Sequence, residues 1–285
     1  MTVPARRRAA SRAIPIDRSF ELLPVFRLSD SADEAAISYE PRTGGRWRVL
    51  PSPGERLPGT FDQDVYVELL RRYHEAGSPA DGALSFTLHA LLRSMGRRVD
   101  GRTYEQLRSA LTRLLRTTLE SDNAYVDASS GTTMNGSFSM LSSVQIDRRR
   151  NTEREQLALF PAMTSNEPGD ARITIAAPIR ANIAAGNTVL LSSTRYFALS
   201  SPVARRVYRL LEVMRPQAFP LWRISLDQLA EQLPLVQRFP SHLQRVLQPA
   251  HEMLVAAGIL RSAVFVQEAR VWHVDYTLGP AQHQP

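Results

Sequence analysis

Cysteine and lysine are both absent from this 285-residue sequence. Without cysteine the chain has no disulfide, no thiol nucleophile and no cysteine ligand for zinc or an iron–sulfur cluster. Without lysine it has no GxxxxGK[ST] loop, which excludes a P-loop ATPase. No apolar run approaches the roughly 20 residues that a membrane-spanning helix needs. These absences exclude several enzyme classes and predict a protein without a membrane partner.

Motifs for catalysis are missing as well. No two histidines form an HxH or HExxH pair, so neither a zinc protease site nor the His-hydrophobe-His signature of rolling-circle nickases is present. The G-x-S-x-G elbow of serine hydrolases is also absent. Tyr104 is conceivable as a nucleophile that attacks DNA, but its place on the apolar side of a helix favours packing in the core. We therefore predict no catalytic residue, no metal site and no cofactor.

The balance of charge favours a polyanionic partner. The chain has 35 basic and 28 acidic side chains, a net charge of +7 and a pI near 10.3, and every basic residue is arginine. A net positive charge favours nucleic acid over a neutral or acidic partner. Arginine also presents a planar fork that matches phosphate and guanine. Since a chain without cysteine fits a reducing compartment, we expect a cytoplasmic protein.

The segment 103–119, TYEQLRSALTRLLRTTL, predicts an amphipathic helix. Its apolar face carries Tyr104, Leu107, Leu111, Leu114 and Leu115. The opposite face, together with the arginine that precedes the segment, carries Arg102, Gln106, Ser109, Thr112, Arg113 and Arg116. Amide, hydroxyl and guanidinium groups of this kind hydrogen-bond base edges and phosphates in a major groove. The alternative is a solvated helix face without a ligand.

The elements around this helix predict a winged helix. Two shorter helices precede it, one from Thr60 to Gly77 and one from Ser85 to Gly96, and strands over 124–128 and 137–146 follow it. Three helices with a tight turn before the third resemble a helix-turn-helix, and a hairpin after the third is what a wing requires. The run Arg148, Arg149 and Arg150 follows the second strand and is placed to bind phosphates.

A similar order of elements recurs over 196–278. Its third helix, from Ser241 to Gly258, divides in the same way into an apolar and a polar face. The polar face carries Ser241, Gln244, Arg245 and Gln248, and the apolar face carries Leu243, Val246, Leu247, Ala250 and Leu254. Pro249 lies within the helix and either kinks it or divides it into two shorter helices.

Together these patterns predict an α+β, mostly helical protein with tandem winged-helix domains. The expected divisions are a flexible basic and acidic arm over 1–45, a first winged-helix domain over 46–192 and a second over 193–280. Two linked DNA readers on one chain raise affinity by effective concentration, provided that both reach their half-sites.

Four stretches of the sequence have a familiar order: GERLPGTFDQDVYVELLRRY (54–73), the helix over 103–119, SPVARRVYRLLEVM (201–214) and RVLQPAHEMLVAAGIL (245–260). In these stretches the sequence resembles the replication initiator protein A family of bacterial plasmids and secondary replicons. It implies a tandem winged-helix protein that binds repeated sites in an origin, helps to open the duplex and recruits a host replicative helicase or its loader. By that analogy the third helix of each unit reads DNA, and Pro249 lies in a kinked second reading helix.

Four functions remain open at this point. The first is an origin-binding initiator without catalysis of its own, acting on double-stranded origin DNA, with single-stranded DNA and a homodimer as open alternatives. The others are a winged-helix transcription regulator, a nicking enzyme that uses a tyrosine, and a single-stranded-DNA-binding protein of replication and repair. Stacking aromatics would support the last, and the candidates are Phe265, Trp272 and Tyr276.

Overall fold

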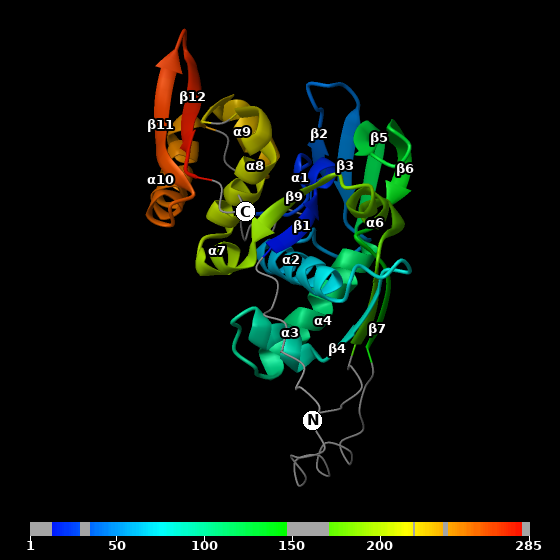
Figure 1. The fold of residues 1–285 in the computed structure, drawn as a ribbon. Coiled ribbons are helices and arrows are strands. Elements are labelled where there is room, and N and C mark those ends of the chain that lie inside the picture. The colour runs from blue at the N-terminus through cyan, green and yellow to red at the C-terminus, as the bar shows by residue number, and fades with distance from the viewer. Residues whose placement is uncertain (1–12, 29–34, 147–170, 219, 236–238, 281–285) are drawn as a thin grey trace, which may run out of the picture.

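The computed structural model describes residues 13–28, 35–146, 171–218, 220–235 and 239–280. Figure 1 shows the elements from α8 to β12 gathered on one side of the molecule and most of the earlier elements on the other. The strands form four antiparallel sheets among the described residues, with the orders β2-β3-β5-β6, β4-β8-β7, β10-β12-β11 and β1-β9.

One set of six elements, here called the N-terminal repeat, contains the helix that is expected to read DNA. The elements are α2 (Thr60–Glu75), β4 (Ala83–Phe86), α3 (Leu88–Ser94), α4 (Gly101–Arg116), β7 (Leu141–Ile146) and β8 (Ala171–Ile175). The three strands pair in the order β4-β8-β7, so the last strand of the repeat lies in the middle of its sheet.

A second set, the C-terminal repeat, has the same order of elements. It consists of α8 (Pro202–Ala218), β10 (Leu221–Ser225), α9 (Leu226–Gln232), α10 (Pro240–Ala256), β11 (Leu260–Glu268) and β12 (Val271–Leu278). Its strands pair in the order β10-β12-β11, which is again first, third, second. The order predicted from the sequence, three helices followed by two strands, therefore recurs in the structure, whereas the strand after the first helix and the sheet order were not predicted.

The hairpin that follows α4 differs from the prediction. The expected strand over 137–146 is divided between β6 (Thr132–Phe138) and β7, while the expected strand over 124–128 is the end of a longer β5 (Thr118–Asp127). The β5–β6 hairpin extends the sheet formed by β2 (Ile37–Tyr39) and β3 (Arg46–Leu50). The counterpart of β11 and β12 in the N-terminal repeat is therefore β7 and β8, and β5 and β6 are an insertion.

The prediction of a flexible arm over 1–45 is wrong for the residues of it that the structure describes. Strand β1 (Ala13–Asp17) pairs along its whole length with β9 (Thr188–Ser192), and β2 pairs with β3 across the expected boundary at residue 46. Helix α1 (Arg18–Glu21) is buried, and the indole Nε1 of Trp47 donates a hydrogen bond to the Pro24 carbonyl at 2.9 Å. The partner of β1 lies more than 100 residues away and leaves no local pattern, which is why the start of this segment resembled a tail. Residues 1–12 and 29–34 lie outside the described residues.

Helix boundaries follow local capping. Asp100 caps α4 by accepting a hydrogen bond from the Thr103 amide at 2.9 Å, and the helix ends at Arg116 because Thr118 already belongs to β5. Helix α2 is capped at Gly59, next to its predicted start, whereas α3 is capped at Thr87 because Ser85 and Phe86, predicted to open this helix, belong to β4. The remaining helices are α6 (Ala177–Ala184) and α7 (Ser193–Ala198). Of the helices in the described part of the chain, none is both long and apolar enough to cross a bilayer.

Candidate nucleic-acid interface

Helix α4 packs through the apolar face that its sequence predicts. Leu107, Ala110, Leu111 and Leu114 are all fully buried. Tyr104 is half-buried at the edge of this face, with its hydroxyl 3.3 Å from Nδ1 of His89. Its packing against the core agrees with the structural interpretation of this tyrosine.

The opposite face of α4 is open to solvent over most of its length. Arg102, Gln106, Ser109 and Arg116 are exposed, and Thr112 is half-buried with its hydroxyl bonded to the Arg108 carbonyl at 3.0 Å. Arg102 and Arg116 contact no carboxylate among the described residues and lie roughly 21 Å apart along the helix axis at 1.5 Å per residue. This face is available to a polyanion.

Arg113 was predicted to belong to that exposed face, and this is wrong. Its side chain is 6% exposed, and its Nε and Nη2 donate to the two carboxylate oxygens of Asp62 at 3.0 and 2.7 Å. Asp62 also accepts the Gly59 amide at 2.7 Å. The helical pattern places Arg113 between Arg102 and Gln106 on the polar face, and a buried acid on α2 supplies the partner that this pattern does not show.

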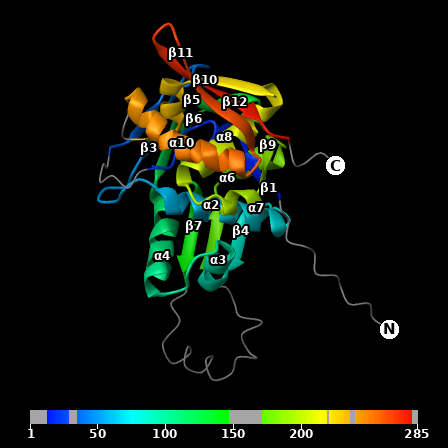
Figure 2. The ribbon, with the colours of Figure 1, turned by 90° about the vertical axis from the view of Figure 1, so that its left-hand side faces the viewer.

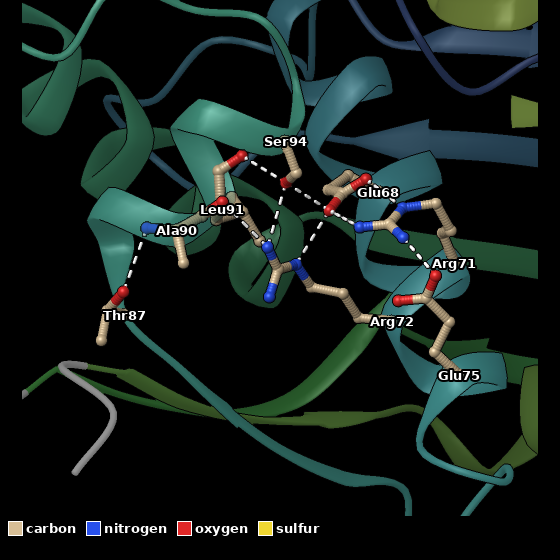
Figure 3. Close-up of polar contacts among 8 residues, drawn as sticks. All are labelled: Glu68, Arg71, Arg72, Glu75, Thr87, Ala90, Leu91 and Ser94. Atoms are coloured by element: carbon tan, nitrogen blue, oxygen red, sulfur yellow. Dashed lines mark hydrogen bonds and ion pairs between the residues drawn. The ribbon is translucent and has the colours of Figure 1, made fainter. Parts of the chain in front are cut away.

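A polar network fixes α3 against α2 in the turn that leads to α4 (Figure 3). At its centre is Glu68, which is fully buried and accepts hydrogen bonds from Arg71 at 2.7 Å, from Arg72 at 2.8 Å and from the Ser94 hydroxyl at 2.5 Å. Arg72 also donates to the Ala90 carbonyl at 2.9 Å. Since Ser94 and Ala90 lie on α3, Glu68 holds the first helix of the turn in place.

Helix α10 is the counterpart of α4 in the C-terminal repeat, and it is one continuous helix with Pro249 inside it. Its buried positions are Leu243, Leu247, Ala250, His251 and Leu254. Val246 was predicted to point inward, but it is 39% exposed. Figure 2 shows α10 above α4, with α2 between them in that view.

The polar residues predicted for α10 are distributed as expected with one exception. Ser241, Arg245 and Gln248 are exposed, whereas Gln244 is half-buried and its Nε2 has no partner among the described residues. The Gln248 amide donates to Glu252 at 2.9 Å, one turn along the helix. Arg245 is therefore the exposed cation of this helix face within the described part of the chain.

The contact between α10 and β12 inside the C-terminal repeat is aromatic and neutral. Nε2 of His251 lies 2.8 Å from the hydroxyl of Tyr276 on β12, and burial lowers the pKa of His251 to about 4. The Tyr276 ring is fully buried and stacks on Trp222 at 5.4 Å. Of the three aromatic candidates for base stacking, Tyr276 is thus inaccessible, and Phe265 packs on the His251 ring at 5.4 Å.

One exposed side chain at this surface escaped the sequence analysis. Phe239 is 71% exposed at the start of α10, with its ring 6.2 Å from that of His242. The available signal was an aromatic residue directly before the proline that opens the helix, Pro240. The predicted phosphate-binding residues Arg148, Arg149 and Arg150 lie outside the described residues, in the stretch between β7 and β8.

The sequence matches a family model over residues 17–251, and the model is that of replication initiator protein A. The chain belongs to the replication initiator protein A family. The match begins at Asp17, at the end of β1, and reaches His251 in α10, so it covers all of α4 and most of α10. It also includes most of the segment 1–45, which precedes the stretches that carry the resemblance.

Solved structures share the fold of this family member at low sequence identity. Two crystal structures of domains 2 and 3 of RctB match it with TM-scores of 0.53 and 0.51. They are 10% and 9% identical, and cover 90% and 92% of this chain and 95% and 97% of their own. A crystal structure of the Pi initiator protein in complex with iteron DNA reaches a TM-score of 0.48 at 13% identity, covering 78% of this chain and 94% of its own. None of the curated proteins matches the sequence.

Proposed function

We propose that this member of the replication initiator protein A family is an origin-binding initiator that reads repeated duplex sites through two winged helices. The observation that carries the proposal is that each repeat presents one helix whose open face holds arginine, glutamine and serine. On α4 these are Arg102, Gln106, Ser109 and Arg116, and on α10 they are Ser241, Arg245 and Gln248. Such side chains suit a major groove.

The topology of both repeats supports the winged-helix assignment. Each has a strand between its first and second helices, and that strand pairs with the last strand of the repeat. The hairpins β7–β8 and β11–β12 are then the wings. In a helix-turn-helix the second helix of the turn enters the groove, which assigns the reading role to α4 and α10.

In this proposal the protein does no chemistry of its own. It helps to open the origin duplex and recruits a host replicative helicase or its loader, in the cytoplasm at the nucleoid or a plasmid. Double-stranded origin DNA is the main ligand, and single-stranded DNA is a second ligand to be tested. Whether the protein forms a homodimer is tested separately. If supercoiled origin DNA became nicked in the presence of Mg²⁺, and a Tyr104→Phe variant did not nick it, the proposal of a non-enzyme would fail.

A replication assay separates an initiator from a transcription regulator. A plasmid whose only replication region is this gene with its flanking DNA is expected to persist in cells that supply no other initiator for it. If it were lost while the protein still bound a specific duplex, a transcription regulator would be the better account.

Arg116→Ala is expected to weaken duplex binding by ~1–3 kcal/mol if the guanidinium grips a guanine. The reason is that Arg116 is exposed at the end of α4 without a carboxylate partner among the described residues. The measurement is a titration of a duplex selected in vitro with the full chain, followed by single-base substitutions of that duplex. Relaxed specificity at one base pair identifies a base contact. An equal loss of affinity for all sequences, with the slope of log binding constant against log salt concentration smaller by about one, identifies a phosphate contact.

Arg46→Ala is the matched control for Arg116→Ala. Arg46 is an exposed arginine on β3, in the four-stranded sheet outside both repeats. Its nearest acid is Glu40 at 3.8 Å, so little stability depends on it. Equal losses of binding for the two variants would contradict the assignment of α4 as a reader.

A further inference from the structure

Three arginines of helix α8 are buried, although arginine is a surface residue unless it is paired. Arg205, Arg206 and Arg209 are 8%, 3% and 1% exposed. Their carboxylate partners, Glu21 on α1 and Asp64 on α2, are themselves 1% and 2% exposed. We call these five residues the inter-repeat joint, because α8 belongs to the C-terminal repeat while α2 belongs to the N-terminal repeat.

The first contact of the joint centres on Glu21. Nε and Nη2 of Arg209 donate to the two carboxylate oxygens of Glu21 at 2.8 and 2.7 Å, which is a bidentate pair. Nη1 of Arg206 donates to the Glu21 carboxylate at 3.2 Å and to its backbone carbonyl at 2.9 Å, and Nη2 donates to the Leu23 carbonyl at 3.2 Å. Both the side chain and the main chain of α1 are therefore bonded to α8.

The second contact centres on Asp64. Its carboxylate accepts hydrogen bonds from the Tyr196 hydroxyl at 3.1 Å, from Arg97 at 2.7 Å and from Nη1 of Arg205. Nε of Arg205 also donates to the Leu199 carbonyl at 2.7 Å. Asp64 thus joins α2, α7, α8 and the turn before α4 at one point.

Helix α1 is in turn held against the N-terminal half of the molecule. The Tyr66 ring on α2 lies 5.3 Å from the Phe20 ring and 5.8 Å from the Phe26 ring. On the other side of the segment, the buried Asp17 accepts hydrogen bonds from Asn182 at 3.1 Å and from the Tyr125 hydroxyl. A contact between α8 and Glu21 is therefore a contact with a fixed part of the N-terminal half.

A joint of this kind has one favourable geometry. Buried ion pairs contribute little net stability, but separating one leaves an uncompensated charge in a medium of low dielectric constant. The bidentate Glu21–Arg209 pair adds a directional requirement that apolar packing lacks. Rotation of one repeat against the other would break several such contacts together.

We propose that the inter-repeat joint holds α4 and α10 in one relative orientation, so that the protein recognises two half-sites only at one spacing and one helical phase. The assignment of α4 and α10 as readers rests on the proposed function. The fixed orientation itself rests on the contacts of the joint alone. Glu21 and Arg209 are accordingly positioning residues that do not contact DNA.

The orientation is tested without DNA by a distance measurement between the two helices. Because the chain has no cysteine, Ser109→Cys on α4 and Ala256→Cys on α10 provide unique sites for spin labels at exposed positions. Pulsed electron paramagnetic resonance is expected to give one narrow distance distribution for this labelled protein. Glu21→Gln, which leaves two buried arginines without a carboxylate, is expected to broaden it at least twofold.

A milder variant and a matched control keep this test decisive. Arg209→Lys retains the charge but loses the bidentate fork, and it is expected to give a smaller broadening even if Glu21→Gln fails to fold. Arg215→Lys is the control, since Arg215 makes a similar bidentate pair with Glu212 at 2.8 Å within the same helix. It should leave the distribution unchanged. A narrow distribution in a folded Glu21→Gln protein, or no change in Arg209→Lys, would overturn the proposal.

The consequence for DNA is tested with spacing variants of a duplex selected in vitro with the full chain. Inserting 5 base pairs between the half-sites moves them to opposite faces of the duplex, since a helical turn is about 10.5 base pairs. The unsubstituted protein is expected to lose on the order of 10²–10⁴-fold in affinity, which is the gain that linked binding provides. Arg209→Lys should lose less than tenfold on the same insertion.

The possible results separate the two proposals. If the unsubstituted protein tolerates the insertion, or if Arg209→Lys is as sensitive to it as the unsubstituted protein, the spacing rule is wrong. If no specific duplex is selected at all, the proposed function fails, and the distance measurement still decides whether the joint fixes the orientation.

Discussion

Arg113→Ala is expected to destabilise the folded protein by about 3–5 kcal/mol, which is the effect of removing one partner of a buried ion pair. Asp62 would keep the Gly59 amide as a partner but would lose both hydrogen bonds from the guanidinium. Its charge would then be buried between α2 and α4 without compensation. The measurement is the free energy of unfolding from a urea titration at neutral pH. The dependence of this free energy on urea concentration should be the same for both proteins if unfolding is two-state.

The control for this prediction lies one turn further along the helix. Arg116 is exposed, so Arg116→Ala should change stability by no more than about 0.5 kcal/mol while it weakens binding to DNA. The two variants therefore separate a structural arginine from a reading one. If Arg113→Ala instead kept the stability of the unsubstituted protein and lost specificity for one base pair, the side chain would have to reach DNA, and the buried pair would be refuted.

The difference in unfolding free energy between Asp17→Asn and the unsubstituted protein is expected to shift in favour of the variant as the pH rises from about 4 to 8. The expected shift is about 4 kcal/mol, since one pKa unit corresponds to about 1.36 kcal/mol. Burial raises the pKa of Asp17 to about 7, against the opposing effect of hydrogen bonds from Tyr125 and Asn182. The carboxyl group has no cation in contact with it among the described residues that would offset the loss of water.

The sign follows from where the proton is held. Between about pH 4 and 7 the folded protein keeps a proton on Asp17 that the unfolded chain releases, because the folded-state pKa is the higher of the two. This contribution to stability is fully present below the unfolded pKa and is lost as the pH rises through about 7. Asparagine resembles the protonated acid and has no charge to bury, so its stability does not fall in this window.

Asp127→Asn is the control with the opposite trend. Hydrogen bonds from the Ser129 hydroxyl and amide lower the pKa of Asp127, which lies at the turn of the β5–β6 hairpin. Its contribution is present at neutral pH and is lost as the pH falls, so this substitution should not stabilise the protein at pH 8. Unfolding curves for the three proteins at pH 4, 6 and 8 give the comparison. A constant difference between Asp17→Asn and the unsubstituted protein over this range would contradict the raised pKa.

The sequence by itself determined the local elements and their order. The helices predicted over 103–119 and from Ser241 to Gly258 correspond to α4 and α10, which bury most of the expected apolar faces. These features depend on side-chain periodicity and on capping groups within a few residues, and a single stretch of sequence contains both. The same reasons allowed the recurrence of three helices and a hairpin to be predicted without sequence identity between the copies.

Only the tertiary structure decided which polar side chains are exposed and able to bind DNA. Arg113 has the residue type and the helical position expected of a DNA contact, but its ion pair with Asp62, 51 residues away, buries it. Arg209 likewise pairs with Glu21 across 188 residues, and this contact turns an apparent tail into a structural part of the molecule. Burying a charged side chain is costly unless a partner compensates it, and where that partner is distant, as for these two arginines, local sequence carries no record of it. The local sequence therefore determines the apolar and polar faces of each helix. Whether a given arginine can reach DNA or is buried in the core depends on the whole fold.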